Sequence, residues 1–273
     1  MHPDTKAVMM KLGRVVPGFL KPYLRPLFQL AVDVAKRLGY RRLSRTDVHG
    51  YWRTPPDRNV PASYLKGSAR STWLVEFAQK HLDGDARNNT LLEIGCNIGR
   101  NLEFFHRAGF RNLSAIEINE DAVKLLRGHF PEMGSTAQIH VGPVEEVIKT
   151  FGDNQFDVVY TVAVLEHIHT QSEWVFGEMA RIARRLVITI EDERHLSDRH
   201  FPRNYGKVFT ALGLTQLESV ECVKVEGMGL RGGFFARVFA KAVSPALGSE
   251  AAPVGLDASE AAGEAVGGGW RGS

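Results

Sequence analysis

A glycine-bearing turn with acidic residues on either side of it is the stretch of the chain best suited to chemistry. Gly95 and Gly99 follow a short apolar run, and glycine lets a ligand approach the backbone and lets φ become positive. Asn97 stands between them and is also tolerant of left-handed geometry. Glu93 precedes the turn, where its carboxylate suits an ammonium group. Glu117 ends the next apolar run and can accept hydrogen bonds from both hydroxyls of a ribose.

The turn is a poor match to a dinucleotide site. Its spacing is G-x-x-x-G, without the third glycine of the G-x-G-x-x-G fingerprint. The carboxylate of Glu93 would also repel a pyrophosphate. An NAD-dependent oxidoreductase is therefore a weaker alternative, and it predicts that the chain binds a nicotinamide.

Short apolar runs alternate with helical patterns through the middle of the chain. The runs predict strands at 90–94, 113–118, 138–141, 156–161, 185–190, 217–225 and 234–239. The helical patterns, with Asn119 and Ser172 as caps, are at 98–108, 120–129, 144–151, 172–183 and 203–212. This alternation predicts an α/β, Rossmann-like fold: a seven-stranded, mostly parallel sheet with helices on both faces and a C-terminal antiparallel strand. Ligands of such sheets bind at the carboxyl ends of the strands, where the turn lies.

Three stretches together resemble the class I S-adenosylmethionine (SAM)-dependent methyltransferases. The first motif of that family is similar to E-I-G-C-N-I-G-R-N-L at 93–102, and Glu117 is the acid that ends its second strand. The adenine-flanking motif is similar to V-G-P-V-E-E at 141–146, and the fourth-strand motif to F-D-V-V-Y-T-V-A-V-L-E-H-I at 156–168. The resemblance covers residues 64–239. More loosely, the first motif and R-N-Y-G at 203–206 resemble bacterial methyltransferases of polysaccharide biosynthesis.

The resemblance implies SAM as the cofactor and a set of residues that bind it. Two positions depart from the family pattern. Asn97 stands where the family usually has a third glycine, and Pro143 stands where an Asp often meets the adenine amine, so Glu145 becomes the candidate for that contact. The implied cofactor-binding residues are Glu93, Gly95, Asn97, Gly99, Asn101, Glu117, Ile118, Gly142, Val144, Glu145 and Thr161.

Methyl transfer from a sulfonium to an oxygen requires alignment and a base, but neither a metal nor a covalent intermediate. His167 and His169 follow the fourth strand, at the rim where the methyl group is expected, and are the candidate catalytic bases. The alternative for His167 is that it packs beneath the substrate loop. The run from Glu191 to His195 is acidic with one histidine, and we predict a solvated or substrate-binding loop there with no metal bound. Cys96 is predicted to be a small buried filler.

Aromatic and basic residues precede the first core helix and predict a lid over the cofactor. Tyr51, Trp52 and Tyr64 lie there together with Arg53 and Arg58. Such residues can contact a sugar or an anionic acceptor. The alternative is that they only pack the lid onto the domain.

Charge divides the chain into three zones. Residues 1–45 carry ten Lys or Arg against two Asp, a net charge of +8, although the whole chain is only +3. They are interleaved with apolar residues, so we predict an amphipathic arm whose residues 6–42 contact a membrane surface or a protein groove rather than nucleic acid. Residues 46–244 form the predicted domain with its lid, and 245–273, rich in Ala and Gly, a disordered tail.

The composition is that of an ordinary globular protein, with 44% apolar and 24% charged residues. Two cysteines cannot build a disulfide framework, and no run of about 18 apolar residues occurs, so we predict a cytoplasmic protein, peripheral on the inner membrane surface if the arm binds lipid. The leading hypothesis is a methyltransferase acting on a small-molecule or glycan acceptor, with O-methylation favoured. The alternative, motivated by Pro143, is a non-catalytic SAM-binding partner or regulatory subunit.

Overall fold

The computed structural model describes residues 42–242, except 57–58, 67–68, 83–84 and 86–87. The predicted basic arm therefore lies almost entirely outside the described residues, and the predicted tail, 245–273, lies wholly outside them.

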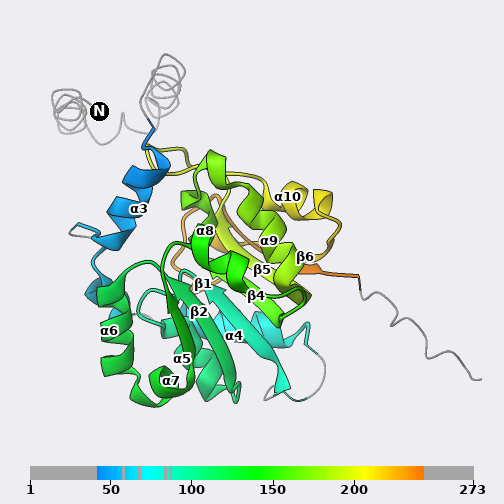
Figure 1. Cartoon of the computed structure of the whole chain (residues 1–273). Helices are drawn as coiled ribbons and strands as arrows, with labels where there is room; N and C mark the ends of the chain where they lie inside the picture. The colour runs from blue at the N-terminus through cyan, green and yellow to red at the C-terminus, as the bar shows by residue number, and fades with distance from the viewer. Residues whose placement is uncertain (1–41, 57–58, 67–68, 83–84, 86–87, 243–273) are drawn as a thin grey trace, which may run out of the picture. The chain divides into compact units, whose positions relative to one another are not determined.

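The described chain builds a seven-stranded sheet in the order β3-β2-β1-β4-β5-β7-β6 (Figure 1). Adjacent strands from β3 through β5 are parallel, whereas β7 lies antiparallel between β5 and β6. This confirms the predicted fold, including its C-terminal antiparallel strand. The strands are β1 (Thr90–Ile94), β2 (Asn112–Glu117), β3 (Gln138–Val141), β4 (Phe156–Val162), β5 (Ala183–Asp192), β6 (Thr215–Glu221) and β7 (Phe234–Ala240).

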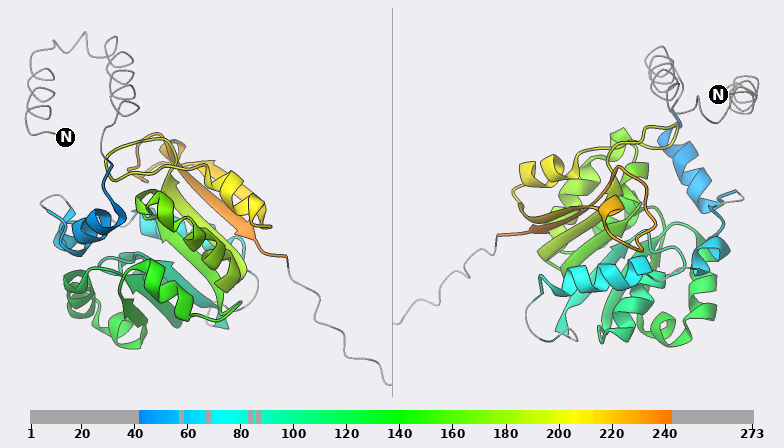
Figure 2. Two further views of the ribbon diagram at one scale, coloured as in Figure 1. Left: turned by 45° about the horizontal axis from the view of Figure 1, so that its top comes forward. Right: turned by 180° about the vertical axis from the view of Figure 1, so that it is seen from behind.

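Helices cover both faces of the sheet: α9 lies in front of it in Figure 1, and α4 lies in front of it in the view from behind in Figure 2. The α-helices are α3 (Arg45–Arg53), α4 (Ala69–Gln79), α5 (Arg100–Arg107), α6 (Glu120–His129), α7 (Pro131–Thr136), α8 (Val144–Val147), α9 (Trp174–Ile182) and α10 (Tyr205–Ala211). Single 3₁₀ turns are η3 (Pro61–Leu65), η5 (Ile148–Thr150), η6 (Leu165–His167), η7 (Thr170–Ser172) and η8 (Cys222–Lys224).

The core consists of two apolar layers, one on each face of the sheet. Leu91 packs into the layer that contains residues of α4 and α5, and its neighbour Leu92 packs into the layer that contains residues of α9 and α10. Both side chains are fully buried. Because successive side chains of a strand point to opposite faces, a strand buried on both faces needs a continuous apolar run, as the sequence of β1 has.

Most predicted boundaries are correct to within two residues, and the larger errors have local causes. The predicted strand 217–225 ends at Glu221, because Cys222 to Lys224 turn into a 3₁₀ helix. Asn119 does cap α6, accepting from two backbone N–H groups. Ser172 is not a cap: α9 starts at Trp174 with Glu173 in the N-cap position.

Gly99 determines how closely α5 approaches α6. Its φ is +73°, and a Cβ at this position would lie 2.5 Å from Cδ1 of Leu126, a fully buried residue of α6. The helix predicted from residue 98 therefore begins at Arg100, after the left-handed Gly99. Gly99 is a packing residue as much as a turn residue.

We expect Gly99→Ala to lower the free energy of unfolding by about 2–4 kcal/mol, because the new methyl group meets Leu126 in addition to the strain of positive φ. Gly109→Ala is the matched control. Its φ is +100° with nothing within 4 Å of an added Cβ, so it should lose only about 1–2 kcal/mol. Urea denaturation measures both variants, and equal losses would show that packing at Gly99 contributes nothing.

Candidate active site

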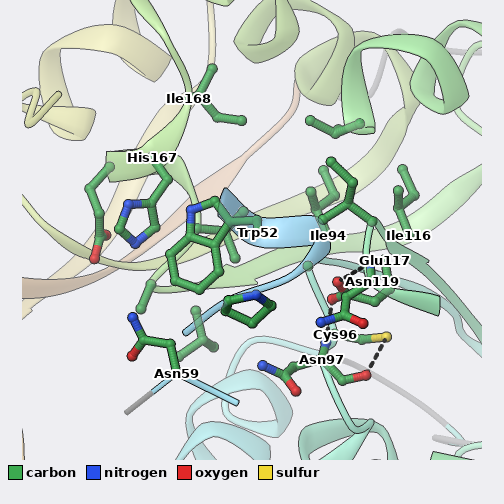
Figure 3. Close-up of a pocket in the computed structure, with 18 of the residues that line it drawn as sticks. Trp52, Asn59, Ile94, Cys96, Asn97, Ile116, Glu117, Asn119, His167 and Ile168 are labelled. Atoms are coloured by element: carbon green, nitrogen blue, oxygen red, sulfur yellow. Dashed lines mark hydrogen bonds between the residues drawn. The ribbon is translucent and has the colours of Figure 1, made fainter. Parts of the chain in front are cut away.

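A pocket of about 530 Å³ lies at the carboxyl ends of the central strands. Such an edge is where open α/β sheets bind ligands, because the helix N-termini and the loops after the strands converge there. Figure 3 shows Trp52 and His167 together, apart from a second group that includes Asn97, Glu117 and Asn119. The sequence-predicted residues that line the pocket are Glu93, Gly95, Asn97, Asn101, Glu117, Ile118, Gly142, Val144, Glu145, His167 and His169.

The turn after β1 has the backbone that its sequence indicated. Gly95 and Asn97 have φ of 73° and 50°, both in the left-handed region. A Cβ on Gly95 would lie 2.5 Å from Val164. The amide oxygen of Asn97 is buried and has no hydrogen-bond partner among the described residues. The turn therefore brings bare backbone to the pocket wall and holds one buried acceptor that has no partner among the described residues.

Glu93 is held in place by a chain of neutral donors. Nδ2 of Asn101 donates to Oε1 of Glu93 over 2.7 Å, and the Tyr160 hydroxyl donates to Oε2 over 3.1 Å. The Ser71 hydroxyl in turn donates to Oδ1 of Asn101 over 2.7 Å. Burial raises the pKa of Glu93 to about 7, against the opposing effect of the hydrogen bonds from Asn101 and Tyr160. A cation bound beside this carboxyl would favour its ionised form.

Glu117 links the end of β2 to the turn after β1. One carboxylate oxygen accepts from the Asn97 N–H over 2.6 Å, and the other accepts from the Asn119 N–H over 2.8 Å. Burial raises the pKa of Glu117, although these backbone hydrogen bonds oppose the shift. Each oxygen of a carboxylate has two lone pairs, so both can still accept from a ligand hydroxyl.

The loop after β3 brings a third carboxylate to the pocket. Gly142 has φ of +154° and its N–H donates to the Glu117 carbonyl oxygen over 2.9 Å. Glu145 follows on α8 and receives a hydrogen bond from Nε2 of His49 at 3.0 Å. Burial alone would raise the pKa of Glu145. The hydrogen bonds from His49 and from the local backbone together outweigh burial, so the pKa of Glu145 lies below its usual value. The His49 contact was not foreseen, since nothing in the sequence pairs residues so far apart.

His167 is sandwiched between two aromatic rings. Its ring centroid lies 4.6 Å from that of Trp52 and 4.6 Å from that of His200. Nδ1 lies 3.2 Å from the carbonyl oxygen of Arg199, which can only accept, so Nδ1 carries the proton and Nε2 keeps its lone pair. Burial, followed by the charge effect of His200, lowers the pKa of His167 to about 3. The ring is therefore a neutral acceptor at physiological pH.

His169 lies in the pocket wall but its lone pair is already engaged. Its Nδ1 accepts from the Gln171 N–H over 3.1 Å and caps η7, and the ring packs edge-on against Phe201 at 5.0 Å. The neutral ring can therefore offer only an N–H to a ligand. Burial and nearby arginines, Arg203 first, lower its pKa.

Thr161 and the predicted acidic loop are buried beneath the pocket. The Thr161 hydroxyl donates to Glu191 over 2.5 Å, and Thr161 does not line the cavity; nor does Gly99. Glu191 also accepts from the N–H groups of Val164 and Leu165 at 2.9 Å each. The prediction of a solvated loop at 191–195 is thus wrong at its start, because Glu191 and Asp192 complete β5 and are fully buried.

Two buried acids support the loop that follows β4. Glu166 accepts from the Asp192 N–H over 3.0 Å and is hydrogen-bonded to Glu191. Burial raises the pKa of both glutamates, and the pair holds a proton because two adjacent carboxyls cannot both ionise without cost. The loop contains Ala163 with φ of +56°, a strained value for alanine. No group of three His, Cys, Asp or Glu side chains in the described part of the chain is arranged to hold a metal ion.

Helix α3 lines the pocket from the N-terminal side. Ser44 and Asp47 form a capping box that starts the helix, and Val48 is its buried apolar residue. His49 then contacts Glu145, whereas Trp52, one turn on, contacts His167. The helix thus spans both ends of the cavity, where the sequence had indicated a lid; Arg58 lies outside the described residues. Cys96 is buried, as predicted.

Comparison with known proteins agrees with this architecture. Residues 92–188, which run from β1 into β5, match the family described as "Methyltransferase domain". The chain is 34% identical over 130 residues to a ubiquinone biosynthesis O-methyltransferase of Caulobacter vibrioides, covering 45% of this chain and 50% of the relative. It is 30% identical over 113 residues to the Bordetella avium protein of that name, covering 41% and 44%. The chain thus matches about half the length of these relatives.

Solved structures share the fold at low identity. A magnesium protoporphyrin IX methyltransferase from Synechocystis has a TM-score of 0.53 at 15% identity, covering 72% of this chain and 98% of that one. The PH0226 protein of Pyrococcus horikoshii has a TM-score of 0.52 at 17% identity, covering 70% and 98%. The matched segment therefore resembles a methyltransferase domain, and the solved structures show the same Rossmann-like fold.

The buried, neutral state of His167 has a consequence for stability. Its folded-state pKa lies near 3 against 6.5 in the unfolded chain, so below pH 6.5 only the unfolded chain takes up the proton, and stability is lost as the pH falls. Replacing His167 with Gln removes this contribution. Between pH 7 and pH 5.5 we expect the wild type to lose about 1 kcal/mol more than His167→Gln, measured by urea denaturation. Parallel losses would contradict a neutral His167.

Proposed function

We propose that this chain transfers the methyl group of SAM to a small-molecule acceptor, with O-methylation favoured. The carrying observation is the crevice at the ends of β1 and β2, where Asn97, whose buried amide oxygen has no hydrogen-bond partner among the described residues, lines the same pocket as Glu117. SAM supplies a methyl group on a sulfonium, whose displacement requires no metal. The chain must then bind the cofactor, orient the acceptor and receive a proton.

The pocket residues fit the polar groups of the cofactor. The unpartnered oxygen of Asn97 can accept from an ammonium group, and the nearby Glu93 carboxyl favours positive charge. Glu117 has lone pairs left for two ribose hydroxyls. Glu145 can accept from an adenine amine if its hydrogen bond to His49 opens. It would then replace the acid that the family often has at the position of Pro143.

Apolar residues complete the cofactor end. Ile94, Ile116, Ile118, Val144 and Ile168 contribute aliphatic surface to the pocket, as a flat adenine ring requires. Gly99 and Thr161, which do not line the cavity, support it instead: Gly99 sets the approach of α5, and Thr161 holds Glu191 under the loop after β4.

His167 is the base that we assign to an oxygen acceptor. Its Nδ1 proton is directed at the Arg199 carbonyl, so Nε2 is the nitrogen with a lone pair. A base of low pKa accepts a proton only weakly, and it therefore suits an acidic hydroxyl, such as a phenol or catechol, better than an alcohol. The O-methyltransferase names of the relatives support the same choice. His169 is better suited to donating a hydrogen bond.

The remaining alternatives differ in what they bind and turn over. A non-catalytic SAM-binding subunit should bind the cofactor without transferring its methyl group, and an oxidoreductase should bind a nicotinamide. A glycan acceptor stays a prediction. Lipid contact through residues 6–42 also stays a prediction, because that arm lies outside the described residues except at its last position. No helix in the described part of the chain is long and apolar enough to cross a membrane.

Calorimetric titration with S-adenosylhomocysteine tests the cofactor site. We expect Glu117→Gln to weaken binding by about tenfold or more, because the amide can accept at only one of its two terminal atoms. Glu120→Gln is the control, since Glu120 is exposed and three positions along the same segment. Equal affinity of Glu117→Gln and the wild type would remove Glu117 from the site. Tighter binding of NAD than of the adenosyl ligand would overturn the proposed function.

Turnover separates an enzyme from a binding-only protein. With catechol or 3,4-dihydroxybenzoate as acceptor, we expect S-adenosylhomocysteine to form, and His167→Gln to slow its formation by about 10²-fold, the low end for a base of low pKa. The affinity of His167→Gln for S-adenosylhomocysteine should equal that of the wild type. If His167→Gln lost cofactor binding in proportion to rate, the role of His167 would be structural.

A further inference from the structure

Two buried hydrogen-bond donors at the acceptor end of the pocket have no partner in the part of the chain that the structure describes. They are the indole N–H of Trp52 and the Nε–H of Arg199, and neither nitrogen is exposed to solvent. Both residues line the pocket. From this we infer that the acceptor carries an anionic oxygen group, a carboxylate or a phosphate, which Arg199 and the Trp52 indole bind beside His167. This inference rests on the proposed methyl transfer and names the class of its substrate.

The two donors belong to one aromatic cluster. The ring of Trp52 lies 5.1 Å from that of Tyr51, and the guanidinium of Arg199 lies 4.7 Å over the Tyr51 ring. Trp52 also packs at a tilt against His167, which contacts the Arg199 carbonyl. A ligand group that reached both donors would therefore lie next to the proposed base.

Leaving these donors unpaired is costly. A buried donor without a partner costs about 1–3 kcal/mol, and more when it is part of a charged group. A planar carboxylate or a phosphate oxygen matches a guanidinium donor and makes hydrogen bonds that are stronger than those of a neutral oxygen. A ligand with such a group would remove both penalties when it binds.

The charges around this end of the pocket favour an anion. Within the described ranges, the ion pair of Arg199 is long: its Nη1 lies 3.8 Å from the carboxylate of Asp198, a half-exposed side chain. Arg231, also in the pocket wall, is paired with the buried Asp192 at 2.9 Å, and Asp192 is shared with His195. Arg199 therefore keeps most of its charge available.

The other charged residues of the wall include both signs. Arg45, Arg70 and Arg100 line the same pocket. Among its acids, Glu93, Glu117 and Glu145 belong to the cofactor end, and Glu166 holds a proton jointly with Glu191. Burial, followed by the charges of Arg199 and Arg231, lowers the pKa of His200 to about 4. The charges of Arg199 and Arg231, which disfavour a proton on His200 against the opposing effect of Asp192 and Asp198, are also charges that attract an anion.

An anion at this position would also assist the chemistry. An opposite charge within a few ångströms favours the protonated form of a histidine, so it raises the basicity of the ring. Bound beside His167, the acceptor's own charge would shift that base toward the pKa range in which proton transfer is efficient. Substrates that carry the anion would then be turned over faster as well as bound more tightly.

The test uses the full chain saturated with S-adenosylhomocysteine, whose binding is confirmed first by calorimetry. The probes are 4-hydroxybenzoate, phenyl phosphate and the uncharged methyl 4-hydroxybenzoate. We expect one or both anions to bind at least about tenfold more tightly than the ester, and the comparison of the two anions identifies the group. Equal or tighter binding of the ester, with cofactor binding intact, would overturn the inference and leave the proposed function standing.

Variants separate the two donors from general charge. We expect Arg199→Gln to weaken the preferred anion at least about tenfold and to leave the ester unaffected, whereas Arg199→Lys should restore part of the affinity. Trp52→Phe keeps an aromatic ring but removes the pyrrole ring with its N–H. It should weaken the anion a few-fold, which keeps the test informative if Arg199→Gln does not fold. Arg107→Gln, exposed on α5 and outside the pocket wall, is the control. Unchanged anion affinity in folded Arg199→Gln would refute the inference.

Discussion

The hydrogen bond from the Asn97 N–H to the Glu117 carboxylate is the interaction on which the site depends. It joins the turn after β1 to the end of β2 over 2.6 Å, and it forms because Asn97 takes a left-handed φ of 50°. The same carboxylate fixes the start of α6 through the Asn119 N–H. One buried acid thus orients two loops and keeps lone pairs for a ligand. Its burial cost, visible as a raised pKa, is offset by these two backbone donors.

A second constraint acts beneath the acceptor end. Glu191 receives the Thr161 hydroxyl and two N–H groups of the loop after β4, and Glu166 receives a backbone N–H at the end of β5. These bonds compensate for the strained Ala163 and place His167 at the cavity wall. Polar groups buried in this way are rigid only when every member is satisfied. The hydrogen-bonded glutamates under the loop support it, whereas the unpartnered donors of Trp52 and Arg199 above it are available to a ligand.

Helix α3 connects the two ends of the pocket. His49 contacts Glu145 at the cofactor end, and Trp52 contacts His167 at the acceptor end, three residues further along the same helix. Residues at this spacing share one face of a helix, so a single short element can respond to both ligands. Any shift of α3 on cofactor binding would therefore also move the wall that faces the acceptor.

The sequence by itself determined which segments form buried strands and where the left-handed turn lies. Continuous apolar runs predict strands that are buried on both faces, and glycine together with Asn97 predicts the turn, because both features depend on local residue type. Most of the site residues that it indicated line the cavity. Only the tertiary structure decided that Gly99 and Thr161 support the cavity rather than line it, that Glu191 is buried, and that His49, Arg199 and His200 belong to the site. Those outcomes depend on contacts between distant segments, and no spacing along the chain encodes such contacts.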